Sequence, residues 1–173
     1  MRGAYLQSLA ANIKAKTFAE IGTARGWHSM LWAQYLLDNN ITDGRVYTCD
    51  VDGMDSRIYK TPLTGDKIFT RRELWDHYPA KSLITFCHRP HESFASTIKS
   101  NIDIVFIDGD HSQAAVINDF TELLPFLTEN TLVIFNDCDE RFPSVQEAVS
   151  RICKDNKVRL NVVTFEPHKY KIA

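Results

Sequence analysis

The sequence predicts a single α/β domain in which helices cover both faces of a mostly parallel β-sheet. Short runs rich in β-branched and aromatic residues alternate with longer helical patterns along the chain, which is typical of repeated βα units. The chain has 173 residues, of which 44% are hydrophobic and 24% charged. This composition supplies one core of ordinary domain size. We therefore expect residues 1–173 to form one domain.

Five strands and six helices are expected in order. The strands cover residues 17–22, 45–50, 82–88, 102–108 and 131–136, and the helices cover residues 4–16, 26–39, 70–77, 93–99, 113–127 and 143–154. Leu6, Leu9, Ala10 and Ile13 recur at the i, i+3, i+4, i+7 spacing of an amphipathic helix. The apolar run of the fourth strand is typical of the buried centre of a parallel sheet. Residues 159–165 and 169–172 are expected to pair as a closing antiparallel hairpin.

Residues 53–80 interrupt this alternation. They contain the turn-forming residues Gly53, Pro62, Gly65 and Pro79. Thr70 and Glu73 form the pattern of a capping box, which predicts the short helix over 70–77. We interpret the segment as an irregular insertion and a candidate lid or substrate-binding region. Trp75 is expected to belong either to that lid or to a hydrophobic interface.

Composition argues against several classes of function. A net charge of −2 does not favour a protein that binds nucleic acid through bulk electrostatics. The four cysteines are far apart and form no C-x-x-C, so reduced cysteines are expected rather than a zinc site or a redox pair. The sequence shows no apolar leader and no stretch near the ~18 apolar residues that a membrane span needs. We expect a cytoplasmic protein with neither a nucleic-acid nor a membrane partner.

A glycine-containing turn follows the first predicted strand. Glu20, Gly22 and Gly26 form E-x-G-x-x-x-G, where the glycines permit positive φ and close approach of a ligand. The helix that follows presents unpaired N–H groups and a positive dipole end. A dinucleotide-binding domain usually shows G-x-G-x-x-G. An acid beside the turn suits a ligand with an ammonium group, such as S-adenosylmethionine, better than a pyrophosphate.

Asp50 ends the second predicted strand, where a carboxylate can accept hydrogen bonds from both ribose hydroxyls of such a ligand. The alternative is an ordinary glycine helix-start with a solvated Asp50. His28, just inside the helix, is expected either to line the pocket or to be solvated.

Polar residues also follow the fourth and fifth predicted strands. Because neighbouring parallel strands lie ~4.8 Å apart, we expect Asp108, Asn136 and Asp137 to converge. Their oxygens suit Mg²⁺ or another hard divalent cation, which would lower the pKa of a bound substrate hydroxyl. His111 is the candidate general base, because an imidazole titrates near neutral pH.

Structural alternatives remain open for these residues. Asp110 and Ser112 can simply cap the helix that begins near residue 113. His111 can be a packing or solvated residue, and residues 137–140 can be an exposed acidic loop.

Four segments of the chain resemble the class I methyltransferases grouped as methyltransferase domain 24. They are Phe18-Ala-Glu-Ile-Gly-Thr-Ala-Arg-Gly-Trp-His-Ser29, Val46-Tyr-Thr-Cys-Asp50, Ile104-Val-Phe-Ile-Asp-Gly-Asp-His-Ser112 and Leu132-Val-Ile-Phe-Asn-Asp137. The likeness spans about residues 1–155, although residues 53–80 match little. It implies a Rossmann-like, mostly parallel seven-stranded sheet with a reversed final strand. It also implies S-adenosylmethionine as methyl donor and, usually, O-methylation of a small molecule.

The resemblance also implies roles for individual residues. The methionine part of the donor would be surrounded by Glu20, Gly22, Thr23 and Gly26, with Ser29 near its carboxylate. Asp50, with Val51 beside it, would hold the ribose, and Asp108 would sit beside the reactive centre. In some relatives, among them macrolide-sugar and catechol-type enzymes, a metal is held at the positions of Asp108, Asn136 and Asp137. In the sugar-type relatives a histidine at the position of His111 serves as base.

Three hypotheses follow from the sequence. The first is O-methylation of a small-molecule hydroxyl, such as that of a sugar, by a domain for which a homodimer is the candidate assembly. The second is an adenosylmethionine-binding protein without transfer activity, acting as a sensor, a subunit or a cofactor scavenger. The third is a nicotinamide-dependent oxidoreductase, which the absence of G-x-G-x-x-G disfavours.

Overall fold

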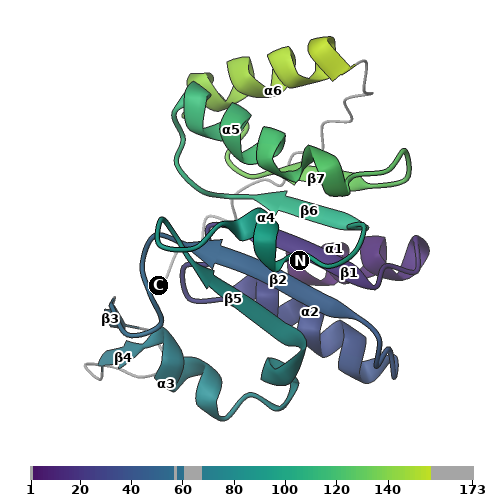
Figure 1. Cartoon of the computed structure of the whole chain (residues 1–173), viewed down its shortest axis with the longest axis vertical. Coiled ribbons are helices and arrows are strands. Elements are labelled where there is room, and N and C mark those ends of the chain that lie inside the picture. Colours follow the sequence, from purple (N-terminus) through teal and green to yellow (C-terminus); the bar gives the residue numbers. More distant parts are fainter. Residues whose placement is uncertain (1, 57, 61–67, 157–173) are drawn as a thin grey trace, which may run out of the picture.

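The computed structural model describes residues 2–56, 58–60 and 68–156, which form a Rossmann-like α/β fold around one parallel sheet. The sheet has the order β5-β2-β1-β6-β7 (Figure 1). Its strands are β1 (Thr17–Ile21), β2 (Arg45–Asp50), β5 (Ile84–His88), β6 (Ile104–Ile107) and β7 (Leu132–Phe135). All four neighbouring pairs in this sheet are parallel. The strand order reverses direction at β1, so the carboxyl end of β1 lies where an α/β fold usually binds its ligand.

Helices cover both faces of the sheet, as predicted. They are α1 (Arg2–Asn12), α2 (Trp27–Asp38), α3 (Arg71–Asp76), α4 (Phe94–Thr97), α5 (Gln113–Leu123) and α6 (Pro143–Asn156), with 3₁₀ turns η1 (Pro79–Leu83) and η2 (Leu124–Phe126). Pro125 lies in η2 and cannot donate a helical hydrogen bond. This explains why the helix expected over 113–127 ends earlier as α5. The first helix also ends earlier than expected, near Lys14, which adopts a left-handed φ of 54°.

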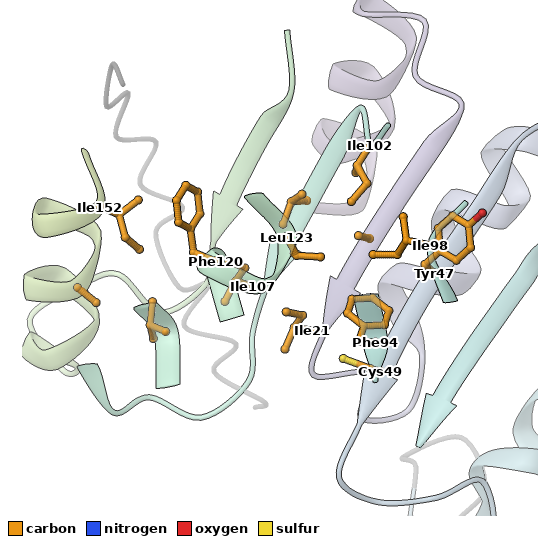
Figure 2. Close-up of a cluster of buried hydrophobic side chains, with 14 of the residues drawn as sticks. Ile21, Tyr47, Cys49, Phe94, Ile98, Ile102, Ile107, Phe120, Leu123 and Ile152 are labelled. Carbon is orange, nitrogen blue, oxygen red and sulfur yellow. The ribbon is translucent and has the colours of Figure 1, made fainter. Parts of the chain in front are cut away.

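The core has two parts because alternate strand residues face opposite sides of the sheet. Ala19 and Ile21 pack with α4, α5 and α6 in the larger cluster, part of which Figure 2 shows. Phe18 packs on the other face with buried residues of α1 and α2, including Trp32 at a ring distance of 5.2 Å. Glu20 lies two residues after Phe18, and residues two apart in a strand point to the same face of the sheet. The Glu20 carboxylate is therefore buried beside this second cluster.

The insertion has more structure than expected. Short strands β3 (Ile58–Lys60) and β4 (Ile68–Thr70) pair antiparallel, and Thr70 and Glu73 form the predicted capping box at the start of α3. The expected hairpin over 159–172 lies outside the described residues, as does any seventh strand formed there. No helix in the described part of the chain is long and apolar enough to cross a membrane.

Candidate functional site

The turn after β1 contacts the end of β6 directly. Gly22 has φ 92°, a conformation that favours glycine. A Cβ at this position would overlap the carbonyl oxygen of Asp108. Gly22 N–H also donates to the carbonyl of Cys49 at 3.0 Å. Gly22 therefore allows the ends of β1, β2 and β6 to meet at the switch point.

The second glycine of the turn is covered by protein. Gly26 (φ 86°) is the N-cap of α2 and offers no side-chain cap. A Cβ there would overlap the indole of Trp75 in α3, whose Nε1 donates to the carbonyl of Arg25 at 2.9 Å. The space beside Gly26 is thus filled by Trp75.

Asp50 is held by three donors at the end of β2. Its Oδ2 accepts hydrogen bonds from Ala24 N at 2.7 Å and from Arg71 Nη2 at 2.9 Å. Its Oδ1 accepts from Asp52 N at 2.9 Å, and the side chain is 10% exposed. Beside it, Val51 is 71% exposed. Asp50 is therefore a fixed, paired carboxylate with an exposed apolar neighbour, and the alternative of a solvated carboxylate does not describe it.

Glu20 anchors a buried polar network beneath the turn. Its Oε2 accepts from Ser29 Oγ and from Thr48 Oγ1, the latter at 2.9 Å, and Oε1 lies 3.2 Å from His28 Nδ1. Thr23 Oγ1 lies 2.6 Å from Thr48 Oγ1. Glu20, Thr23 and Ser29 are all buried. The structure thus places these three predicted site residues inside the domain, where they fix the turn and the start of α2.

The residues after β6 and β7 converge as expected. Asn136 Nδ2 donates to Asp108 Oδ1 at 2.6 Å and to Asp137 Oδ2 at 2.9 Å. His111 joins them, with Nε2 3.5 Å from Asp137 Oδ2. One ligand atom from each of Asp108, His111 and Asp137 lies within 4.8 Å of the others, and all three side chains are half-buried. The two carboxylates suit a hard divalent cation, and the His111 imidazole lies beside them.

His111 is fixed by the loop after β7. Its ring lies 4.2 Å from that of Phe142, and its carbonyl accepts a hydrogen bond from Ser144 Oγ at 2.6 Å. These contacts aim the imidazole at Asp137. Of the alternatives, helix capping is confirmed for Ser112, whose Oγ accepts from Ala115 N. Asp110 instead accepts from Ser112 N at 2.7 Å, a bond that lowers the pKa of the Asp110 carboxyl.

A family model described as a methyltransferase domain matches residues 19–138. The chain belongs to this methyltransferase family. The match runs from β1 to just beyond β7 and includes the glycine turn, Asp50 and the cluster of Asp108, His111 and Asp137. The resemblance noted in the sequence is thereby confirmed.

One curated protein matches part of the chain. A protein of Acanthamoeba polyphaga mimivirus is 35% identical over 78 residues, which are 44% of this chain and 34% of that protein. The chain therefore matches only about a third of that relative's length.

Solved structures show the same fold. The O-methyltransferase TomG of Streptomyces achromogenes, solved with S-adenosylmethionine, is 20% identical with a TM-score of 0.62, covering 92% of this chain and 69% of its own. A methyltransferase of Podospora anserina, solved with S-adenosylhomocysteine, is 15% identical with a TM-score of 0.66, covering 94% of this chain and 73% of its own.

Two residues of the methyltransferase domain that meet the turn were not among the predicted site residues. Arg71 and Trp75 stand four apart on α3, and residues four apart share one face of a helix. Both side chains are buried, and both donate to the glycine turn. The capping box predicted where α3 starts. The spacing of Arg71 and Trp75 was the sequence signal that could have identified the face of α3 that packs against the turn.

A cleft of about 330 Å³ lies beside the loop after β2. It is lined by Gly53, Met54, Asp55, Ser56, Arg72, Phe86, His88 and Glu92. Asp50 is not among these residues, but the cleft adjoins it, because His88 pairs with Asp50 between β2 and β5 and Phe86 lies under the Arg71 guanidinium.

Proposed function

We propose that this methyltransferase domain transfers the methyl group of S-adenosylmethionine to a hydroxyl of a small molecule, with a sugar as a candidate acceptor. The observation that carries the proposal is the contact between Gly22 and the Asp108 backbone. It joins the turn suited to the donor to the cluster suited to activating an acceptor. The donor and the acceptor would then meet at one sheet edge, where orientation alone can supply much of the rate.

Three features support binding of the donor. The Asp50 carboxylate stands at the end of β2 for the ribose, and exposed Val51 offers an apolar contact to the adenine. The first N–H groups of α2 lie behind Gly26, which supplies no side-chain cap. These groups suit the carboxylate of the methionine part. The two structural relatives described above contain the donor and its product.

The proposed transfer is a direct displacement. The acceptor oxygen attacks the methyl carbon as the carbon–sulfur bond breaks, and the sulfur keeps the electron pair to give S-adenosylhomocysteine. The acceptor's hydroxyl proton passes to the His111 imidazole, which Asp137 and Phe142 hold in place. A divalent cation held by Asp108 and Asp137, with Asn136 beside them, would lower the pKa of the acceptor hydroxyl.

Binding and transfer are tested separately. Titration calorimetry of the full chain with S-adenosylmethionine and S-adenosylhomocysteine should show binding of both. Transfer from a methyl-labelled donor to a panel of sugars and phenols should then fall by about 10²–10⁴-fold in His111→Gln. Binding of neither ligand would reject the proposal, and binding without transfer to any acceptor would favour the non-catalytic alternative.

The cation has its own test. Mn²⁺ binding, followed by electron paramagnetic resonance, should weaken at least about tenfold in Asp137→Asn, because one of two carboxylate ligands is lost. Asp139→Asn is the matched control, since Asp139 lies two residues away, is 43% exposed and pairs with Arg141. Equal Mn²⁺ affinity in all three proteins, together with transfer that survives EDTA, would remove the cation from the proposal.

A further inference from the structure

Arg71 is a fully buried arginine that joins both sides of the crevice. Its Nε donates to the carbonyl of Ala24 at 2.6 Å, in the turn after β1. Its Nη1 donates to the carbonyl of Asp52 at 2.6 Å, in the loop after β2, and its Nη2 donates to Asp50 Oδ2. The guanidinium also lies over the Phe86 ring, 4.8 Å from its centre. Burying such a cation is costly unless it is paired, and here it pairs with the residue expected to hold the ribose.

The hydrogen bonds of Arg71 and Asp50 hold Ala24, a residue with a strained backbone conformation. Ala24 has a left-handed φ of 45°, which costs a non-glycine residue about 1 kcal/mol. Its N–H donates to Asp50 Oδ2, and its carbonyl accepts from Arg71, which itself donates to the same Oδ2. Arg71 and Asp50 therefore fix both sides of Ala24. Trp75, one helical turn further along α3, fixes the adjoining Arg25 carbonyl.

The same bonds limit what Asp50 can still accept. A carboxylate has about four acceptor positions, two on each oxygen. Ala24 N and Arg71 Nη2 occupy those on Oδ2, and Asp52 N occupies one on Oδ1. One acceptor position on Oδ1 remains. Asp50 can therefore take one ribose hydroxyl in this arrangement, and not the two expected from the sequence.

We infer that Arg71 is a positioning residue for the cofactor, holding Asp50 so that the domain recognises one of the two ribose hydroxyls. The inference rests on the proposed function, because it requires an adenosine-containing ligand. A planar fork with three aligned donors is needed to reach two carbonyls and a carboxylate together. A lysine would keep the charge but lose that geometry.

The test compares ligands and variants by titration calorimetry. For the wild-type chain, one of the 2′-deoxy and 3′-deoxy analogues of S-adenosylhomocysteine should bind about ten- to a hundred-fold more weakly than the parent. The other should stay within about threefold, since only one hydroxyl bonds to the charged group. In Arg71→Lys the parent should bind about tenfold more weakly and the gap between the two analogues should close, because Asp50 can then turn.

Arg72→Lys is the matched control. Arg72 is the next residue, but its side chain is 54% exposed and pairs with Asp55 rather than with the turn. It should preserve both the affinity and the gap between the analogues. An equal loss in Arg72→Lys would overturn the inference, because the ligand would then lie in the neighbouring cleft.

The outcomes separate the inference from the proposed function. If the wild-type chain binds S-adenosylhomocysteine but loses both analogues equally, or if Arg71→Lys keeps the gap, the role of Arg71 is wrong and the proposed function stands. If the wild-type chain binds neither the donor nor its product, the proposed function fails and the inference fails with it. If Arg71→Lys does not fold, the wild-type chain still tests the recognition of one hydroxyl, because an equal loss of both analogues overturns the inference.

Discussion

The two ends of the crevice hold their carboxylates in opposite ways. Asp50, at the β2 end, is nearly buried and is paired with an arginine that has no exposed surface. Asp108 and Asp137, at the β6 and β7 end, are half-buried and lie close together. The arginine that faces Asp137 is 69% exposed and also pairs with Asp139.

This difference separates binding from chemistry. A buried, neutralised pair keeps its geometry in the absence of ligand, which suits recognition of a fixed group. Two close carboxylates with weak compensation favour a cation, and a bound cation is what activation of a hydroxyl requires. The turn at Gly22 holds the two ends together, so the comparison can be tested first at that residue.

Gly22→Ala should give the largest effect. The new Cβ would overlap the Asp108 carbonyl and would sit at φ 92°, so we expect a loss of about 3 kcal/mol in the free energy of unfolding. Urea unfolding measures this loss. Gly3→Ala is the control, since a Cβ there meets Leu31 Cδ1 at an ordinary 3.6 Å and alanine favours a helix by about 0.5–1 kcal/mol. Similar stability in both variants would show that the close contact between Gly22 and the Asp108 carbonyl is not needed for stability.

The same substitution at the two ends should have unequal effects. Asp50→Asn leaves the Arg71 cation buried without its counter-charge but keeps an acceptor oxygen, so the free energy of unfolding should fall by about 2 kcal/mol. Asp137→Asn removes one of two neighbouring negative charges, so stability should change by less than about 1 kcal/mol. Urea unfolding of both variants at pH 7 checks the contrast, and equal losses would contradict the distinction between the two ends.

Much of the fold could be predicted from local patterns. The alternation of apolar runs and helical periods located all five strands of the parallel sheet, because each pattern is set within a few neighbouring residues. The β3–β4 pair was missed, since strands of three residues are too short to show a period of two. Convergence of Asp108, His111 and Asp137 was predictable because parallel strands bring their carboxyl ends to one edge.

The partners of the buried charges were harder to predict. Arg71 bonds to residues 19, 21 and 47 positions away in the sequence, and no local pattern records such contacts. Glu20 differs, because strand alternation already placed it on the face of Phe18, towards α2. The sequence therefore contained the signal for a buried Glu20, although the prediction placed Glu20 beside the methionine part of the donor. Only the packing of α3 shows that the spaces beside the turn are filled by Arg71 and Trp75.

The smallest expected effect concerns a second buried aspartate–arginine pair, on the opposite face of the sheet. Asp119 of α5 lies 2.8 Å from Arg89, which also pairs with Glu122. Burial raises the pKa of Asp119 above its ordinary 3.8, although Arg89 opposes the shift. The folded state therefore holds this proton more tightly than the unfolded state. The stabilisation is complete below pH 3.8 and is lost as the pH rises through the raised pKa.

Urea unfolding between pH 3 and 6 tests this sign. The stability of the wild-type chain relative to Asp119→Asn should decline as the pH rises. Asp43→Asn should behave in the opposite way, because hydrogen bonding to Lys16 lowers the pKa of exposed Asp43. The stabilisation that Asp43 provides is present above pH 3.8 and is lost as the pH falls through its lowered pKa. A rise with pH for Asp119 would mean that the ion pair with Arg89 outweighs the effect of burial on the Asp119 carboxyl.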